Sequence, residues 1–362
     1  MATDNAVRWT SAEVVEVETV ARDVRRIVLS PEEAVHARPG SHVDVRPGHS
    51  LDDRNDDLHD NDPRPGTLTR SYSVVDSTDG GRRLTLTVQL ATASRGGSAR
   101  MHRLAVGDRI AVTQPLQNFP LGVGAPRYIL LAGGIGITAV LAMAQALRSR
   151  GADYHLVVSG RSRADLPYLE RLTALHGDRL ELHISDEGTR LDVMELVGQV
   201  RDGDHPLRTE LYMCGPIGLL DAVRQAWATH GLPAPNLRFE TFGSSGSWQA
   251  QPFTIRLADT GREVRVPANS TALEALEAAG MAVMSDCRKG ECGLCAVRVL
   301  EVSGRVDHRD VFLDDTQKAA ADQLCLCVSR AAVPTRGPDI GGTDDIDDPD
   351  GTGNAVLTVR LA

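Results

Sequence analysis

Three cysteines within nine residues are the group in this sequence whose types and spacing point most clearly to chemistry. Cys287, Cys292 and Cys295 follow the C-x4-C-x2-C spacing of the loop that holds a plant-type [2Fe–2S] cluster. Gly290 and Gly293 lie between them, and glycine lets a tight loop bring backbone N–H groups close to sulfur atoms. Structural zinc sites usually carry two C-x2-C pairs, and disulfide frameworks do not compress three cysteines so tightly. The loop therefore predicts an iron–sulfur cluster rather than zinc-bound or ordinary buried cysteines.

The fourth ligand of such a cluster must come from further along the chain, and two residues qualify. Cys325 follows Cys295 after 29 intervening residues, which is the common plant-type interval, and Cys327 lies two residues later. Spacing alone leaves both open. A [2Fe–2S] cluster carries single electrons, so the rest of the chain should contain an electron source and lead to an electron acceptor.

Composition limits the kind of protein that can carry this cluster. A length of 362 residues predicts two or three domains. The net charge of −10 argues against a nucleic-acid partner and gives no polybasic anchor for a membrane surface. No apolar run approaches ~20 residues and the N-terminus lacks a signal-peptide core, so we expect a soluble, cytoplasmic protein with no membrane partner. Five of the six cysteines lie near one end, as ligation in a reducing compartment would require.

Two motifs in the N-terminal part suit a ligand with a phosphate and an aromatic ring. Ser94–Ser98 contains Gly-Gly and opens a short helix predicted to run through Leu104, and amides at a helix N-terminus bind phosphate. Arg70 can add a bidentate contact and Tyr72 an aromatic surface, although R-x-Y-S also fits an ordinary strand. Alternating apolar residues predict the surrounding strands near Arg8–Val20, Val24–Leu29, His42–Arg46, Arg70–Val75 and Leu84–Ala91.

Two stretches interrupt these patterns. Residues 48–66 are rich in Asp and Pro, a composition that does not build a core, so we interpret them as a solvated surface insertion. A metal site on the nearby histidines is the less favoured alternative. Residues 334–354 are rich in Gly and Asp, and this composition predicts disorder. A calcium site in the Asp344–Asp350 run is the less favoured alternative, because the run lacks the EF-hand spacing.

The middle of the chain alternates short apolar strands with helices, which predicts a doubly wound parallel sheet. A strand at Tyr128–Ala132 is followed by a glycine loop, Gly133–Ala139, and a helix, an arrangement in which the backbone can approach a pyrophosphate. Ligands bind at the carboxyl ends of such strands, where Cys214 and Gly215 also fall. A buried core thiol is the alternative interpretation of Cys214. Further strands are expected at Leu156–Ser159, Leu180–Ile184 and Leu211–Cys214, the last followed by a helix to about His230.

The C-terminal part predicts a small α+β domain around the cysteine loop, after a flexible linker at Ser244–Ser247. Thr271 and Glu274 form the S/T-x-x-E pattern of a helix start, and Gly280 is a suitable end. The other expected elements are a hairpin of Phe253–Leu257 and Glu263–Val266, a helix at Asp314–Gln323 and a last strand at Ala355–Leu361.

Taken together, these motifs resemble the phthalate dioxygenase reductase family, the reductases of Rieske-type oxygenases that include vanillate O-demethylase reductases. The resemblance covers roughly residues 10–330 and the last strand. The motifs in family order are R-x-Y-S (Arg70–Ser73), R-G-G-S (Arg95–Ser98), G-G-I-G-I-T (Gly133–Thr138), C-G-P (Cys214–Pro216), Phe239-Glu240-x-Phe242 and Asp307–Asp310. This chain departs from the family at Ala139, which replaces a proline, at the insertions near 48–66 and 335–353, and at the additional thiol of Cys325.

The resemblance implies a multidomain fold in a fixed order. An FMN-binding antiparallel β-barrel is expected at residues 1–122. An α/β NAD(P)H-binding domain with a parallel sheet should occupy 123–243, a linker 244–251, and a plant-type ferredoxin domain of the α+β β-grasp fold 252–362. Relatives that use FAD usually carry the ferredoxin domain first or lack it, so this order favours FMN.

The resemblance also assigns residues to roles. Cys214 and Gly215 would face the hydride-transfer site, with Cys214 as the candidate catalytic residue. The local match around Asp322–Arg330 makes Cys327, rather than Cys325, the fourth cluster ligand beside Cys287, Cys292 and Cys295. The flavin would be held by Arg70, Tyr72, Ser73, Arg95, Gly97 and Ser98, and the nicotinamide nucleotide by Gly134, Ile135, Gly136 and Thr138.

The implied activity is electron transfer from NADH through FMN and the [2Fe–2S] cluster to a terminal oxygenase of the Rieske type, an aromatic oxygenase or demethylase. Two alternatives are a reductase for a cytochrome P450 or other monooxygenase, and a non-catalytic redox-sensing module. NADPH is the alternative nucleotide, because Arg161 and Arg163 follow the second strand of the nucleotide domain, where guanidinium groups can accept a 2′-phosphate.

Overall fold

The computed structural model describes residues 7–46, 69–91, 96–242, 248, 250–333 and 355–361. These residues form two compact units, the first ending at Phe242 and the second containing the described residues from Trp248 onward. The expected division of the first unit near residue 122 stays a prediction. The predictions for residues 48–66, 244–247 and 334–354 lie outside the described residues.

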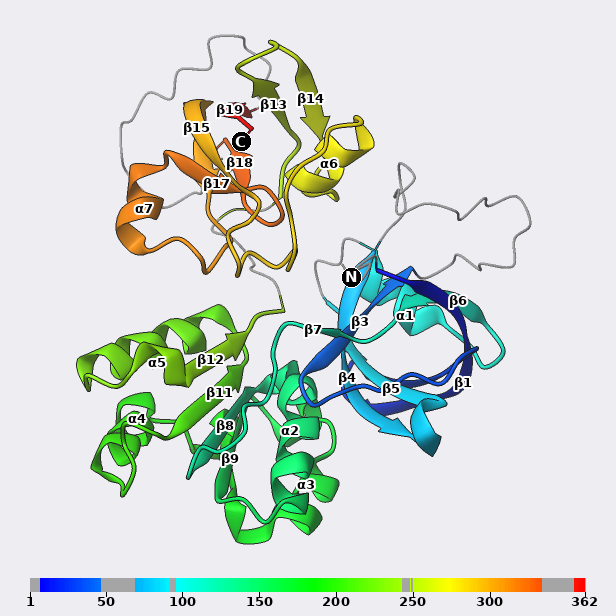
Figure 1. Cartoon of the computed structure of the whole chain (residues 1–362), viewed down its shortest axis with the longest axis vertical. Helices are drawn as coiled ribbons and strands as arrows, with labels where there is room; N and C mark the ends of the chain where they lie inside the picture. Colours follow the sequence, from blue (N-terminus) through cyan, green and yellow to red (C-terminus); the bar gives the residue numbers. More distant parts are fainter. Residues whose placement is uncertain are drawn as a thin grey trace, which may run out of the picture. The chain divides into compact units, whose positions relative to one another are not determined.

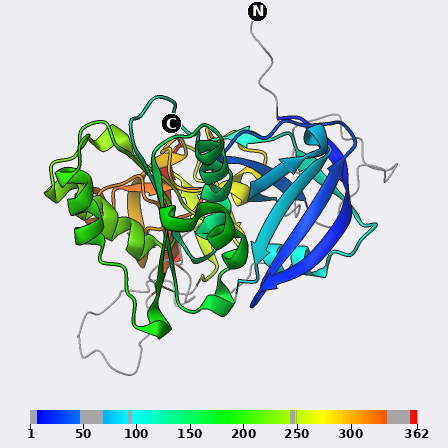
Figure 2. The same ribbon diagram turned by 90° about the horizontal axis from the view of Figure 1, so that it is seen from below.

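The first part of the first unit is an antiparallel barrel (Figures 1 and 2). The strand order is β4-β5-β2-β1-β6-β3, and β3 also pairs with β4, which closes the barrel. Alternate residues point inward and bury aliphatic side chains such as Ile27, Val43 and Leu84. The strands are β1 (Trp9–Ala21), β2 (Val24–Pro31), β3 (Ser41–Arg46), β4 (Arg70–Thr78), β5 (Arg83–Gln89) and β6 (Arg109–Thr113), with β7 (Leu116–Gln117) beside β3.

Two short helices accompany the barrel strands. The 3-10 helix η1 (Asp79–Gly81) joins β4 to β5, and the helix α1 (Gly97–Arg103) follows β5. Gly96, directly before α1, has a φ of 98°, a left-handed conformation that glycine adopts without strain. The predicted Gly-Gly turn into a short helix is confirmed.

The second part of the first unit is a five-stranded parallel sheet in the order β10-β9-β8-β11-β12. Helices α2 and α3 lie on one face and α4 and α5 on the other (Figure 1). The strand order reverses between β8 and β11, and ligands of such sheets bind at that switch point. The strands are β8 (Tyr128–Gly133), β9 (Tyr154–Gly160), β10 (Leu180–Ile184), β11 (Glu210–Cys214) and β12 (Leu237–Glu240).

The helices of this sheet follow its strands in the expected alternation. They are α2 (Ile137–Ser149), α3 (Leu169–His176), α4 (Val193–Asp202) and α5 (Ile217–Thr229), with 3-10 turns η2 (Gly134–Gly136), η3 (Arg163–Asp165), η4 (Gly177–Arg179), η5 (Ser185–Glu187) and η6 (Ala234–Asn236). Every residue of β8 is buried, as in a strand covered on both faces. None of the helices in the described residues is long and apolar enough to cross a membrane.

The second unit contains a five-stranded mixed sheet in the order β14-β13-β19-β15-β17 and a two-stranded sheet of β16 and β18. The last strand in the chain, β19, lies between β13 and β15, parallel to the first and antiparallel to the second. The strands are β13 (Phe253–Leu257), β14 (Glu263–Val266), β15 (Ala296–Ser303), β16 (Arg305–Asp307), β17 (Gln323–Cys325), β18 (Arg330–Ala332) and β19 (Ala355–Arg360).

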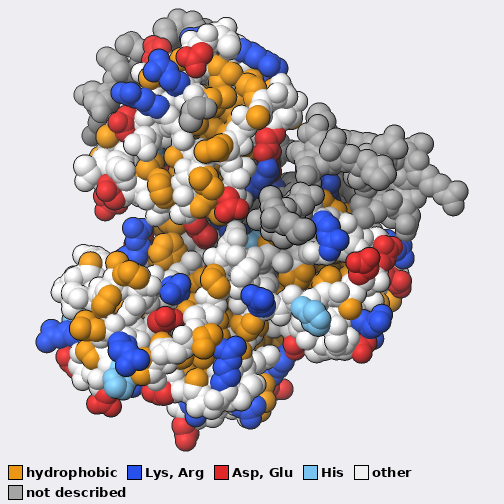
Figure 3. All heavy atoms as spheres, viewed as in Figure 1, with side chains coloured by type: hydrophobic (Ala, Val, Ile, Leu, Met, Phe, Trp, Pro, Cys, Tyr) orange, Lys and Arg blue, Asp and Glu red, His pale blue; other side chains and the backbone are white. Residues whose placement is uncertain are grey.

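The two helices of this unit begin as the sequence predicts. Helix α6 (Ala272–Ala278) starts with a complete capping box between Thr271 and Glu274. Helix α7 (Asp315–Ala320) is shorter than the predicted Asp314–Gln323, because Ala321 adopts a left-handed conformation with a φ of 52° and the chain then enters β17. On the face drawn in Figure 3, acidic and basic side chains are interspersed over each unit.

Candidate functional site

The cysteine loop surrounds its first sulfur atom with backbone donors. The N–H groups of Lys289, Glu291 and Cys292 each lie 3.4 Å from Cys287 Sγ. Burial raises the pKa of the Cys287 thiol, and the three amides act against that rise because they stabilise a thiolate. Such N–H donors are what sulfur atoms of an iron–sulfur cluster require.

Two glycines give this loop its shape. Gly290 and Gly293 have φ values of 77° and 75°, in the region that favours glycine. A Cβ atom at Gly293 would lie 2.3 Å from the ring of Phe312, and one at Gly290 would lie 2.6 Å from Val328. Larger residues would therefore force the loop away from its neighbours. The predicted role of both glycines in a tight loop is confirmed.

Cys325 and Cys327 both lie beside Cys295, in different positions. Cys325 belongs to β17 and pairs with Ala296. Hydrogen bonds from Cys325 and Cys327 lower the pKa of Cys295. The hydrogen bond to Cys295 and burial raise the pKa of each of the other two.

The surroundings of Cys327 favour it as the fourth ligand. The Gly290 amide donates to its sulfur, and the thiols of Cys287 and Cys295 are among its neighbours. The neighbours that act most strongly on Cys325 are Cys295, Asp310 and Cys327. Among the described residues, no three His, Cys, Asp or Glu side chains are arranged to hold a single metal ion. The assignment to a two-iron cluster therefore rests on the amide-lined loop, which suits a [2Fe–2S] cluster. The choice of Cys327 as the fourth ligand stays a prediction.

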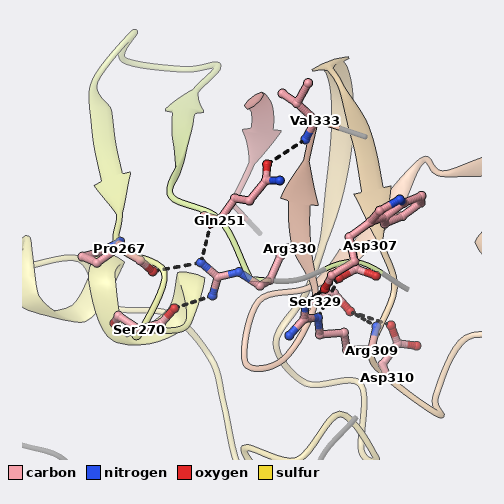
Figure 4. Close-up of polar contacts among 10 residues, drawn as sticks. Gln251, Pro267, Ser270, Asp307, Arg309, Asp310, Ser329, Arg330 and Val333 are labelled. Atoms are coloured by element: carbon pink, nitrogen blue, oxygen red, sulfur yellow. Dashed lines mark hydrogen bonds and ion pairs between the residues drawn. The ribbon is translucent and has the colours of Figure 1, made fainter. Parts of the chain in front are cut away.

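A buried polar network supports the segment that carries Cys327 (Figure 4). Ser329 is fully buried, and its hydroxyl donates to Asp310 Oδ1 at 2.8 Å and accepts from Arg309 N at 3.0 Å. Burial would raise the pKa of Asp310, but His308, whose Nδ1 lies 3.6 Å from Asp310 Oδ1, and hydrogen bonds from the Leu313 amide and Ser329 hold it below its usual value. The Asp307–Asp310 motif thus fixes the segment after the ligand.

The adjacent Arg330 was not identified from the sequence as functional. Its buried guanidinium donates to the carbonyl oxygens of Ser270, Gln251 and Pro267 at 2.5, 3.0 and 2.8 Å (Figure 4). It also lies 5.0 Å from the ring centre of Phe253. Arg330 therefore ties the end of the cluster segment to the start of the unit. The sequence indicated this residue only as the last position of the Asp322–Arg330 match.

Serine substitutions at the two candidate ligands test the assignment. We expect Cys327→Ser to abolish the visible absorption and the electron paramagnetic resonance signal of the reduced cluster, because the fourth thiolate is lost. Cys325→Ser serves as the matched control and should retain both signals. A cluster that survives in Cys327→Ser and is lost in Cys325→Ser would exchange the two roles.

The first turn of α1 and the start of β4 form a second candidate site. A Cβ atom at Gly97 would lie 2.8 Å from Arg70 Cγ, so the absence of a side chain there lets Arg70 lie against the helix start. The Arg70 guanidinium also donates to Thr69 O at 2.6 Å. Burial raises the pKa of Tyr72 to about 12, although Arg70 acts in the opposite direction, so Tyr72 is a neutral phenol at neutral pH. A cationic group, a neutral phenol and a glycine turn suit a flavin bearing a phosphate.

The remaining predicted flavin residues have different surroundings. Ser98 Oγ accepts a hydrogen bond from Ala91 N at 3.1 Å, so it orients the chain before α1. Ser73 is buried and donates to Glu240 Oε2 at 3.3 Å. Glu240 is itself buried at the end of β12, and the sequence indicates it only as a member of the Phe239–Phe242 motif. Arg95 lies outside the described residues.

The glycine loop after β8 forms a third candidate site at the switch point of the parallel sheet. A Cβ atom at Gly136 would lie 2.1 Å from the carbonyl oxygen of Cys214, and one at Gly215 would lie 3.0 Å from Gly133 Cα. The ends of β8 and β11 therefore meet through glycine. Thr138 Oγ1 donates to Ile135 O at 2.9 Å and holds the turn into α2.

The predicted nucleotide residues Gly134, Ile135, Gly136 and Thr138 thus share one turn beside Cys214 and Gly215. The Cys214 side chain is fully buried in the core of the sheet, which agrees with the alternative interpretation as a core thiol. Its assignment as a catalytic residue stays a prediction.

A closed barrel, a nucleotide-binding sheet and an amide-lined cysteine loop in one chain define an oxidoreductase of the modular electron-transfer class. The family of 2Fe-2S iron-sulfur cluster binding domains matches residues 255–332. The vanillate O-demethylase oxidoreductase of Pseudomonas sp. strain HR199 is 34% identical over 333 residues, covering 90% of this chain and 95% of that protein. The phenoxybenzoate dioxygenase subunit beta of Ectopseudomonas oleovorans is 37% identical over 73% of this chain and 81% of its own. The chain belongs to the phthalate dioxygenase reductase family.

Solved structures resemble the chain over nearly its whole length. Phthalate dioxygenase reductase, described as a modular structure for electron transfer from pyridine nucleotides to [2Fe-2S], is 27% identical with a TM-score of 0.71 and covers 97% of this chain and 98% of its own. An intact type IV self-sufficient cytochrome P450 monooxygenase is 33% identical with a TM-score of 0.61 and covers 98% of this chain but 41% of its own. The predicted family and the predicted multidomain fold are confirmed.

Proposed function

We propose that this reductase carries electrons from a reduced nicotinamide nucleotide through FMN and a [2Fe–2S] cluster to a terminal oxygenase. The observation that carries the proposal is the loop of Cys287, in which three amides face one buried sulfur atom. The barrel and the parallel sheet of the same chain carry the candidate flavin and nucleotide sites, which would provide the electrons. Bound FMN would supply the conversion between a two-electron hydride donor and the one-electron cluster.

The residues of the chain bind and orient these groups. Arg70 supplies positive charge beside the first turn of α1, and neutral Tyr72 offers a ring face and a hydroxyl. The turn at Gly136 lets a nucleotide approach the ends of β8 and β11 without a side chain in the way. Cys287, Cys292, Cys295 and Cys327 would hold the two iron atoms.

The favoured partner is a Rieske-type aromatic oxygenase or demethylase in the cytoplasm. Relatives named for a vanillate O-demethylase and a phenoxybenzoate dioxygenase support it. The second candidate is a reductase for a haem oxygenase. The P450 monooxygenase resembles 98% of the length of this chain. The beta subunit of a heme-dependent oxidative N-demethylase from Ectopseudomonas mendocina is 36% identical over 74% of this chain. Purified reductase mixed with each oxygenase encoded beside it, and assayed for NADH-dependent substrate oxidation, separates the two.

Removal of the Arg70 guanidinium tests the flavin site. We expect Arg70→Ala to weaken FMN binding by about 1.5–3 kcal/mol, since a charge-assisted hydrogen bond is lost. Quenching of flavin fluorescence during titration of the apoprotein measures the affinity. Arg83→Ala, an exposed arginine in β5, is the control and should leave it unchanged. Equal affinities for all three proteins, or recovery of stoichiometric FAD after acid release, would contradict the proposed FMN site.

A further inference from the structure

Two turns of opposite charge lie at the edge of the parallel sheet that recognises nucleotides. Strands β9 and β10 are adjacent and parallel, and Gly160 pairs with Ile184 at their carboxyl ends. The chain continues after β9 with Arg161 and Arg163, and after β10 with the turn η5. Because both strands end at the same edge, the two arginines and the acidic residues of η5 are brought together.

The contact between the turns is a bidentate ion pair. Arg163 Nε lies 2.6 Å from Glu187 Oε1, and Arg163 Nη2 lies 2.9 Å from Glu187 Oε2. The two hydrogen bonds raise the pKa of Arg163 and lower that of Glu187, so both side chains are charged at neutral pH. The side chains are 53% and 42% exposed, and such surface pairs add little to folding stability. The pair is therefore accessible to a ligand and can be changed without unfolding the domain.

The acidic turn is held in place by its own hydrogen bonds. The Asp186 amide donates to Arg161 O at 3.0 Å, which ties η5 to the segment after β9. Thr189 Oγ1 accepts from Ile184 N at 2.8 Å and closes the turn from the other side. Glu187 is thus presented to Arg163 by a fixed backbone.

The position matters because the end of the second strand is where doubly wound sheets distinguish NAD from NADP, with an acidic residue for the ribose 2′-hydroxyl or an arginine for the 2′-phosphate. Strand β9 follows β8 and is that second strand. Arg163, which follows β9, already donates two guanidinium hydrogen bonds to the carboxylate of Glu187. If a 2′-phosphate displaced Glu187 from Arg163, the negative carboxylate would remain beside the negative phosphate, and the two would repel each other.

We propose that Glu187 sets the nucleotide preference of this reductase, by occupying the guanidinium of Arg163 and placing negative charge where a 2′-phosphate would bind. The preferred substrate is then NADH. This inference rests on the proposed electron-transfer function, since it concerns the nucleotide that supplies the hydride.

Release of Arg163 should shift the preference. We expect Glu187→Gln to raise the ratio of kcat/KM for NADPH to kcat/KM for NADH about tenfold, measured as flavin reduction in a stopped-flow instrument. The same variant should bind 2′,5′-ADP about tenfold more tightly relative to 5′-AMP by calorimetry, a measurement that needs no electron transfer. Glu263→Gln is the matched control, because Glu263 pairs with Arg256 at 2.8 Å on the second unit with similar exposure. It should change neither ratio.

A second substitution identifies the cause of the shift. In Glu187→Gln/Arg163→Ala the gain for both NADPH and 2′,5′-ADP should disappear, because no guanidinium is left to release. A gain that persists in the double variant overturns the proposal, as does an unchanged 2′,5′-ADP ratio in Glu187→Gln or a wild-type preference for NADPH. If neither nucleotide reduces the flavin while the 2′,5′-ADP ratio still shifts, the electron-transfer function fails and the assignment of Glu187 stands.

Discussion

Replacement of Cys292 with serine is expected to remove almost all NADH-dependent reduction of cytochrome c while flavin reduction continues at close to the wild-type rate. Cys292 lies in the loop whose amides face Cys287, and loss of one thiolate removes an iron ligand. The barrel and the nucleotide-binding sheet form a compact unit separate from the one that contains the loop. Their folding and their reaction with NADH should therefore survive.

Acceptors with different electron sources separate the steps. Ferricyanide can take electrons from the flavin, so its reduction by Cys292→Ser should continue, whereas the native oxygenase should receive almost none. Stopped-flow traces should show flavin bleaching without a later iron–sulfur phase. Cys325→Ser is the control that changes a neighbouring thiol and should behave as the wild type. An undiminished rate with the oxygenase in Cys292→Ser would mean that electrons leave directly from the flavin.

The parts of the sites that could be predicted from the sequence are those whose function depends on local chain geometry. Gly290 and Gly293 bend the cysteine loop within a few residues of the sulfur atoms that they serve. Gly136 likewise acts within the turn between β8 and α2. Residue type and spacing are enough in such cases, because a glycine requirement is a property of the backbone at one position.

The parts that could not be predicted depend on residues far apart in the sequence. Ser73 and Glu240 are separated by 167 positions, yet they form a buried hydrogen bond. Arg330 binds the carbonyl oxygen of Gln251, which lies 79 positions away. No periodicity or spacing indicates such pairs, because they arise only when separate elements pack together. The same limit applies to the second pairing of β3 that closes the barrel.

Strand existence was easier to predict than strand partners. The alternation of apolar residues predicted the last strand near Ala355–Leu361, and β19 spans Ala355–Arg360. Its insertion between β13 and β15 follows from the tertiary fold. Cys214 shows the related limit for function. Its place at a strand end predicted a position beside a bound ligand, whereas the burial of its side chain depends on the surrounding core.

Addition of one methyl group at Gly136 is expected to slow flavin reduction by NADH about 100-fold. The new Cβ atom would lie 2.1 Å from the carbonyl oxygen of Cys214 and 3.0 Å from Gly215 N, and backbone atoms cannot move aside as a flexible side chain can. The φ of Gly136 is −56°, which alanine tolerates, so the effect comes from the collision alone. Separation of the ends of β8 and β11 by about 1 Å would displace a bound nucleotide from the flavin, and such a displacement costs about 100-fold in rate.

The collision should affect hydride transfer and leave the later electron steps intact. In Gly136→Ala, dithionite should still reduce both the flavin and the cluster, and the reduced protein should still pass electrons to cytochrome c. Gly198→Ala is the matched control, since Gly198 lies within α4 and the atoms nearest to its added Cβ are 3.8 Å away. Alanine in a helix is preferred to glycine by about 0.5–1 kcal/mol, so this control should melt at the same or a slightly higher temperature. A wild-type rate of flavin bleaching in Gly136→Ala would show that the nucleotide does not use the turn between β8 and α2, because the collision with Cys214 cannot be relieved without moving that turn.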